Sequence, residues 1–169
     1  MAFDPIGALE VLQRHRVRFV VIGGLAGRLW GSPTMTNDVD VCYARDTLNL
    51  ERLAAALVEL GATLRGVDDD VPFLLDAMPL ERGQNFTFMT VLGPLDLLGL
   101  PAGVRGFDDL AANATTFDLG DGVTVPVCDL DDLIRMKRAA ARPKDRVEVE
   151  ILGAVRDELD RQHRDDRPS

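Results

Sequence analysis

The sequence predicts a mixed α/β (α+β) fold, in which helices flank a mixed β-sheet and a short helical segment ends the chain. Short apolar runs typical of strands are interspersed with segments of helical spacing. A hairpin is also predicted, because Asp121-Gly122 separates two strand-like runs. This order of elements is typical of an α/β or α+β protein with a mixed sheet.

Cap and turn residues delimit each predicted element in the first sixty residues. Asp4 is a helix N-cap, and Pro5 occupies the first helical position. The strand over 38–43 alternates polar and apolar residues, which predicts that one of its faces is buried. We expect a helix after Asp4-Pro5, a strand over 18–22, a helix over 25–30 that stops at Gly31, the strand over 38–43 and a helix over 47–60 that stops at Gly61.

The rest of the chain contains a hairpin and two C-terminal helices. Residues 66–81 show no clear pattern, and their acidic run Asp68–Asp70 predicts a loop because like charges repel. We predict one domain over residues 1–159 and a solvated tail over 160–169. We expect a strand over 85–92, a turn at Gly93-Pro94, a strand over 95–98, a short helix over 107–112, hairpin strands over 115–119 and 123–127, a helix from Asp129 to about Ala140, and a helix from Pro143 to about Leu159.

Composition excludes several classes of protein. The 169 residues are 46% hydrophobic and 28% charged, which is typical of a globular chain and not of a disordered or fibrous one. No stretch approaches the ~20 apolar residues of a membrane helix, and the N-terminus lacks the features of a signal peptide. The cysteines, Cys42 and Cys128, have no metal-like spacing, so we expect a reduced, cytoplasmic protein without a membrane partner.

The charge balance limits the partners that we expect. There are 19 basic and 28 acidic residues, and the net charge of −9 argues against broad, charge-driven binding of nucleic acid. Local basic patches could still dock phosphates, and the candidate segments are 14–18 and 135–144. The two histidines, His15 and His163, offer little basis for a zinc site or a histidine triad.

Residues 23–40 have the composition of a metal–triphosphate site. Asp38 and Asp40 are two residues apart on a strand, so their carboxylates point to the same side. A hard divalent cation, Mg²⁺ before Mn²⁺, relieves their repulsion. Gly23-Gly24 lies between a strand and a helix, where backbone amides can approach a phosphate closely. Asp96 is a lone charge in an apolar strand and a candidate third carboxylate, and its burial requires a partner.

Taken in order, these residues resemble the nucleotidyltransferase superfamily, which has the polymerase-β-like fold. A narrower resemblance, over about residues 17–152, is to small bacterial toxins of the AbiEii and MenT types. Each motif is weak alone, whereas their order and spacing are specific for the superfamily and less so for the substrate. The motifs are Gly23-Gly24-Leu25-Ala26, Gly31, Thr36-Asn37-Asp38-Val39-Asp40, Asp132-Leu133-Ile134-Arg135-Met136-Lys137 and Arg142-Pro143-Lys144-Asp145.

The resemblance implies roles for several of these residues and for Asp96 in an in-line attack on the α-phosphorus of a nucleoside triphosphate (NTP), with two-metal assistance. Thr36 is either a phosphate contact or a turn residue. Two positions depart from the pattern, Thr34 where relatives often have Arg, and Glu148 where they often have Asp. The implied placements are Gly23 and Gly24 at the β- and γ-phosphates, Asp38 and Asp40 at Mg²⁺, Asp96 at a metal and the acceptor hydroxyl, Lys137 at the triphosphate or the leaving pyrophosphate, and Asp145 beside Lys137 or Arg142.

Each of these residues also has a purely structural interpretation. Asp38 and Asp40 could be exposed positions of a one-sided strand, and Asp96 could begin a turn after Pro94. Lys137 could lie on a solvated basic helix face, and Asp145 could only cap the helix that Pro143 opens.

Three hypotheses of function follow. The first is a Mg²⁺-dependent toxin that transfers a nucleoside monophosphate (NMP) from an NTP to the 3′ end of tRNA and blocks translation, with a cognate antitoxin protein as partner. The second is the same chemistry on a protein hydroxyl (AMPylation) or on a small molecule such as an aminoglycoside, for which Asp68–Asp70 and Asp108-Asp109 could supply an acidic pocket. The third is a non-catalytic regulatory module with the same fold.

Overall fold

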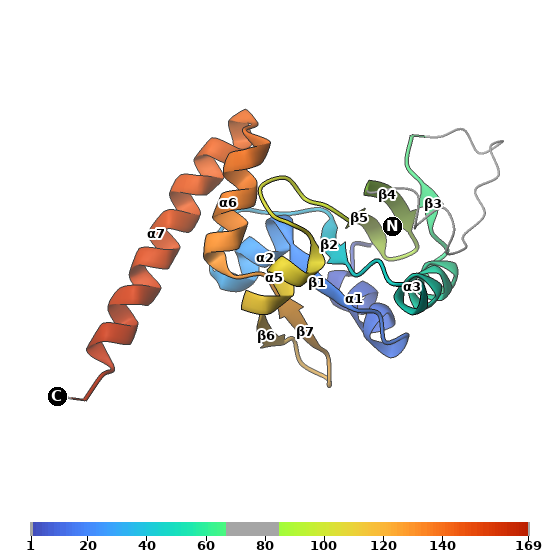
Figure 1. The fold of residues 1–169 in the computed structure, drawn as a ribbon, viewed down its shortest axis with the longest axis horizontal. Coiled ribbons are helices and arrows are strands. Elements are labelled where there is room, and N and C mark those ends of the chain that lie inside the picture. The colour runs from blue at the N-terminus through green and yellow to red at the C-terminus, as the bar shows by residue number, and fades with distance from the viewer. Residues whose placement is uncertain (1, 67–84, 169) are drawn as a thin grey trace.

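One mixed sheet forms the centre of the computed structural model, which describes residues 2–66 and 85–168 (Figure 1). The order of its described strands is β3-β4-β5-β2-β1-β7-β6, and helices flank it, as the sequence predicts. The acidic run Asp68–Asp70 lies outside the described residues. The strands are β1 (Phe19–Ile22), β2 (Val39–Tyr43), β3 (Thr63–Leu64), β4 (Asn85–Thr90), β5 (Gly93–Leu98), β6 (Thr115–Asp118) and β7 (Thr124–Val127).

The described strands combine parallel and antiparallel pairs, and this mixture brings distant segments together. β2 pairs in parallel with β5, and β1 pairs in parallel with β7. The pairs β1–β2, β3–β4, β4–β5 and β6–β7 are antiparallel. β2 and β5 are therefore neighbours in space although α3, β3 and β4 lie between them in the chain.

The described helices begin and end largely where the sequence places their caps. The Asp4 carboxylate accepts a hydrogen bond from the backbone N–H of Gly7 at 2.9 Å, and Asp129 accepts one from that of Asp131 at 2.6 Å. Gly31 and Gly61 end their helices with positive φ, as C-terminal glycines commonly do. The helices are α1 (Pro5–Arg14), α2 (Gly23–Trp30), α3 (Thr47–Glu59), α5 (Phe107–Asn113), α6 (Leu130–Ala140) and α7 (Pro143–Asp165).

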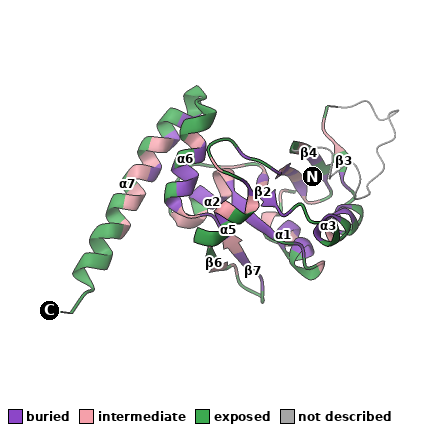
Figure 2. Cartoon of the chain, in the orientation of Figure 1, coloured by how far each residue is buried: buried purple, intermediate pink, exposed green. Residues whose placement is uncertain are grey.

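The core is formed by the central strands and the apolar faces of the helices around them (Figure 2). Every residue of β1 is buried, and so are four of the five residues of β2. On the helical side, α2 packs on α6 and α6 packs on α7, whereas α1 packs on α3. Leu152 anchors α7 to the core, beyond which this helix extends away from the sheet and is largely exposed.

Three sequence-based boundaries are wrong. The turn expected at Gly93-Pro94 lies at residues 91–92, and both Gly93 and Pro94 are in β5, paired with β4. Helix α7 continues to Asp165 instead of ending near Leu159, because no proline or glycine interrupts the segment beyond Leu159. Helix α2 begins at Gly23, so the glycine pair forms its first turn and not a loop before it. No described helix combines the length and the apolar character that a bilayer-spanning segment requires.

Candidate active site

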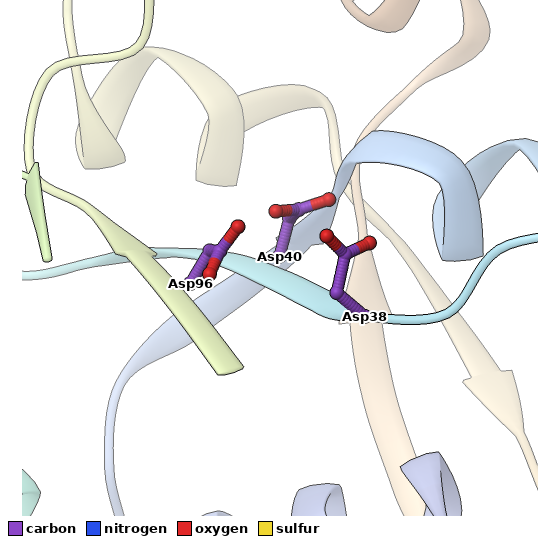
Figure 3. Close-up of side chains that lie close together, drawn as sticks. All are labelled: Asp38, Asp40 and Asp96. Carbon is purple, nitrogen blue, oxygen red and sulfur yellow. The ribbon is translucent and has the colours of Figure 1, made fainter. Parts of the chain in front are cut away.

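Three aspartates meet where β2 and β5 lie side by side (Figure 3). Asp38 immediately precedes β2, Asp40 is in β2, and Asp96 is in β5. The parallel register pairs Asp40 with Asp96, and one carboxylate oxygen of each aspartate lies within 4.8 Å of the others. Three oxygen donors so close together form a ligand set that suits a hard divalent cation.

The electrostatics of the cluster also suit a cation. Burial, together with the neighbouring charges of Asp38 and Asp96, raises the pKa of Asp40 to about 7, against the opposing effect of Lys137. Burial also raises the pKa of Asp96, although the nearby Arg65 guanidinium opposes this. Three carboxylates in a partly buried site repel one another, and a bound cation would relieve that repulsion.

The glycine pair allows helix α2 to begin directly against the aspartates. Gly23 has a φ of +68°, and a Cβ built on it would lie 2.1 Å from Oδ2 of Asp40. A Cβ on Gly24 would lie 2.9 Å from Oγ1 of Thr36. Ile22, the N-cap of α2, supplies no side-chain cap, so the first turn of the helix presents its backbone N–H groups without a capping side chain. Such a helix start next to metal ligands suits a phosphate.

Thr36 connects the loop before β2 to the aspartates. Its hydroxyl donates toward the backbone oxygen of Asp38 at 3.1 Å and lies 3.2 Å from the Oδ1 carboxylate oxygen of the same residue. The contact with Gly24 places this hydroxyl against the first turn of α2. Thr36 therefore supports the orientation of Asp38 from the side on which the helix begins.

A cationic side faces the aspartates from α6 and the start of α7. Lys137 Nζ lies 3.7 Å from Oδ1 of Asp145, and Arg142 Nε donates to Oδ2 of Asp145 at 2.7 Å. Asp145 is buried, which opposes its ionisation, but hydrogen bonds from Arg142 outweigh burial and lower the pKa of Asp145. This carboxylate therefore holds both cations, as the resemblance implies, and it also caps α7 through the backbone N–H of Arg142.

Two cavities border the aspartates and share Asp40, Asp96, Lys137 and Arg142. One, of about 340 Å³, is bordered by Gly24, the loop 34–38, Lys144 and Glu148. The other, of about 440 Å³, has an apolar wall that includes Phe86, Leu98 and Met136. The first is polar and lies at the start of α2, whereas the second lies between the sheet and α6.

The structure brings together all the site residues that the sequence predicts, and it adds one that sequence reasoning missed. Arg65 pairs with Asp96 and is the partner that the burial of this carboxylate requires. The signal for Arg65 was weak, because it follows a two-residue strand next to a segment without a clear pattern. Asp108 and Asp109 do not border either cavity, and Asp109 pairs with Arg105 and Arg135.

The basic segments considered for RNA contact are partly engaged within the protein. Arg14 donates to Glu59 at 2.6 Å, and His15 contacts the same carboxylate. Arg18 lies 3.2 Å from Asp46. Of the basic residues in segment 135–144, Lys137, Arg142 and Lys144 border a cavity at the aspartates, whereas Arg135 and Arg138 do not. That cationic side is consequently the part of the basic surface that faces the site.

No family model and no curated protein sequence matches the chain. Solved structures do match. The lincomycin-bound lincosamide antibiotic adenylyltransferase LnuA has a TM-score of 0.57 and 12% identity, over 87% of this chain and 92% of that one. ANT(2″)-Ia in complex with adenylyl-2″-tobramycin has a TM-score of 0.53 and 13% identity, over 92% of this chain and 94% of that one. A Thermotoga maritima protein assigned as a nucleotidyltransferase has a TM-score of 0.51 and 16% identity, over 92% of this chain and 89% of that one.

These likenesses extend over nearly the whole chain and establish that it has the nucleotidyltransferase fold. The resemblance noted in the sequence is confirmed at this level. At such low identity the likeness concerns the fold alone, and no comparison bears on the narrower resemblance to AbiEii- and MenT-type toxins.

Proposed function

We propose that the protein transfers an NMP from an NTP to a hydroxyl acceptor and releases pyrophosphate, with Mg²⁺ held by Asp38, Asp40 and Asp96. The observation that carries this proposal is the meeting of the three carboxylates with the glycine-rich start of α2. A phosphate-binding helix start beside a set of metal ligands is what a metal–triphosphate substrate requires. A fold shared with adenylyltransferases supports the same chemistry.

The arrangement assigns a task to each side chain. Bound Mg²⁺ would polarise the phosphoryl oxygens and offset the charge that develops on them. The backbone N–H groups of Gly23 and Gly24 would bind the phosphates. Lys137 and Arg142 face the same space and would bind the departing pyrophosphate. As the acceptor oxygen bonds to the α-phosphorus, the bond from that phosphorus to pyrophosphate breaks, and Asp96 takes the hydroxyl proton.

The proposed acceptor is the 3′ end of tRNA, which would make the protein a toxin that blocks translation and that a cognate antitoxin could restrain. The resemblance in the motifs is the first support for this acceptor. The second support is the cationic side formed by Lys137, Arg142 and Lys144, which suits a polyanion. The apolar wall of the larger cavity, with Phe86, would accommodate the terminal nucleoside.

A small-molecule acceptor is the second candidate. Two of the structural neighbours are an antibiotic adenylyltransferase and a protein that carries an adenylylated tobramycin. The larger cavity, about 440 Å³, is in the size range of small-molecule sites. However, Lys137 and Arg142 border this cavity, and they would disfavour a polycationic aminoglycoside once a cation neutralises the aspartates. An acceptor without multiple positive charges fits the cavity better.

The test is a transfer assay with Mg²⁺, each α-labelled NTP in turn, and total bacterial tRNA, a protein mixture or a panel of antibiotics. We expect label in tRNA with the wild-type chain and none with Asp40→Asn. Asp157→Asn, on the exposed part of α7, is the matched control and should retain transfer. Label on protein or antibiotic alone would replace the tRNA assignment, and absence of label on every acceptor would contradict the proposed enzyme.

A further inference from the structure

We infer that Arg65 is a positioning residue that orients the Asp96 carboxylate for the metal and the acceptor hydroxyl. This inference rests on the proposed function. Arg65 belongs to none of the motifs that the sequence analysis singled out. It lies directly after β3, and it contacts Asp96 because β3 pairs with β4 and β4 pairs with β5.

The backbone places Arg65 in the same row of the sheet as the metal-binding aspartates. Leu64 pairs with Phe88 across β3 and β4, and the N–H of Arg65 donates to the carbonyl of Thr87 at 2.9 Å. Thr87 is the register partner of Asp96, and Asp96 is that of Asp40. Side chains in one such row project from the same face of a sheet.

The side chain of Arg65 completes this row with a direct contact. Its guanidinium Nη2 donates to Oδ1 of Asp96. The side chain of Asp96 is 17% exposed and that of Arg65 is 33% exposed, so the pair is shielded from water on most sides. An ion pair of this kind fixes the rotation of a carboxylate more firmly than a contact with mobile solvent does.

One N–H group of the Arg65 guanidinium has no hydrogen-bond partner among the described residues. This group, at Nε, is buried. A buried N–H without a partner costs free energy. The side chain nevertheless keeps this position, so another interaction must offset that cost. The interaction that compensates is the pair with Asp96.

The ion pair with Arg65 gives the two carboxylate oxygens of Asp96 different roles. Oδ1 is engaged by Arg65, and the carboxylate as a whole stays within the cluster formed with Asp38 and Asp40. The second oxygen is thereby left for the metal or the acceptor proton. Without Arg65, the carboxylate would rotate more freely, and the cluster would be less well arranged for a second cation.

Binding of Mn²⁺ tests this inference without any turnover. Binding to the full chain is followed by electron paramagnetic resonance, in the presence of a saturating non-hydrolysable ATP analogue. We expect the wild-type chain to show an ion site that Asp96→Asn removes. Arg65→Gln should weaken this site about 10-fold or more, in the range observed when the partner of a metal ligand is lost. Arg65→Lys should restore part of the affinity, because lysine keeps the charge but lacks the planar fork.

The matched control is Arg161→Gln, which removes an arginine from an exposed ion pair on α7 and should bind Mn²⁺ as the wild type does. Removal of a cation by simple electrostatics strengthens the binding of another cation. Equal or tighter Mn²⁺ binding in Arg65→Gln would therefore overturn the positioning role. If the wild-type chain binds neither Mn²⁺ nor the nucleotide, both the proposed function and this inference fail. If the wild type binds both and Arg65→Gln has the same Mn²⁺ affinity, only this inference fails.

Transfer kinetics supply the second measurement. Arg65→Gln should lower kcat about 10–100-fold while the KM for the NTP stays nearly constant, because Asp38, Asp40 and the start of α2 remain in place. In the Asp96→Asn background, Arg65→Gln should cause no further loss, since the residue acts through that carboxylate. An equal further loss in this background, or a rise in KM without a change in kcat, would contradict the inference.

Discussion

The hydroxyl of Thr34 donates to Oε2 of Glu148 at 2.7 Å and thereby joins the loop before β2 to helix α7. These are the two positions at which the sequence departs from the motifs that it resembles. Ser32 donates to the other oxygen of the same buried carboxylate at 3.0 Å. The two departures are therefore coupled, and the pair anchors the loop that carries Thr36 to helix α7, beside the smaller cavity.

Replacing Glu148 should loosen this loop. Glu148→Gln replaces one of the two acceptor oxygens with an NH2 donor, so one of the hydroxyls of Ser32 and Thr34 must turn to accept and loses its hydrogen bond to a charged group. We expect the free energy of unfolding to fall by about 1–3 kcal/mol, and the KM for the NTP to rise. Urea denaturation and an NTP titration measure these effects. Glu158→Gln, on the exposed part of α7, is the control, and a Glu148→Gln protein that matches it in both measurements would refute the anchoring role.

Gly23 should tolerate no side chain. In Gly23→Ala, the new Cβ would meet Oδ2 of Asp40 at 2.1 Å while the backbone keeps a φ of +68°, which L-residues rarely adopt. We expect a loss of more than about 2 kcal/mol of unfolding free energy and weaker Mn²⁺ binding. Gly153→Ala is the matched control, because its Cβ would meet nothing within 4 Å in the middle of α7; it should stabilise by about 0.5–1 kcal/mol. Similar unfolding curves for the two variants would show that the close approach at Gly23 is unimportant.

The contribution of Asp40 to the stability of the metal-free protein should decline between about pH 4 and pH 7. The pKa of Asp40 is raised to about 7 by burial and by the other carboxylates, so the folded state retains a proton that the unfolded chain releases near pH 4. The contribution of Asp40 is therefore fully present below the unfolded pKa and is lost as the pH rises through about 7. Asp40→Asn lacks this loss and should be more stable than the wild type at pH 8, by roughly 1–3 kcal/mol.

Denaturation at pH 5 and pH 8, with and without Mg²⁺, measures this dependence. Saturating Mg²⁺ should raise the stability of the wild type at pH 8 and leave Asp40→Asn nearly unchanged, because the cation binds the ionised cluster. The prediction is that the wild type loses stability relative to Asp40→Asn as the pH rises from 5 to 8. A wild type that is less stable than Asp40→Asn at pH 5 but not at pH 8 would contradict it.

Asp145→Asn should release Lys137 and Arg142 from the carboxylate that holds them beside the aspartates. Asp145 is only 1% exposed and holds Arg142 and Lys137, so its replacement leaves two cations without their buried counter-charge. Because the Arg142 side chain is 57% exposed, water compensates part of this effect, and we expect a loss of about 1–3 kcal/mol and a higher KM for the NTP. Because the pKa of Asp145 is lowered, its contribution in the wild type is present above the unfolded pKa and is lost as the pH falls through the folded value. The difference between the two proteins, measured by denaturation, should accordingly shrink in acid; a difference that grows would contradict this assignment.

The helix caps and the pairing of Asp38 with Asp40 could be predicted from sequence, since both depend on local geometry. An N-cap acts within three residues, as Asp4 does on Gly7, and two positions of a strand share a face by its period. The glycine pair and the third carboxylate were identified by their setting in strands and turns. Where the prediction was wrong, at Gly93-Pro94, the positive φ of Gly93 suits the edge of a hairpin as well as a turn, and only the pairing with β4 distinguishes the two.

The sequence by itself determined the fold class, the cap positions and the identity of the three aspartates, because periodicity and turn chemistry act over a few neighbouring residues. Only the tertiary structure decided which partners those aspartates have. Arg65 reaches Asp96 through the register of β3, β4 and β5, and Glu148 reaches Thr34 because α7 packs behind α2. Contacts of this kind depend on strand order and helix packing, which join residues far apart in the chain and leave no local pattern in it.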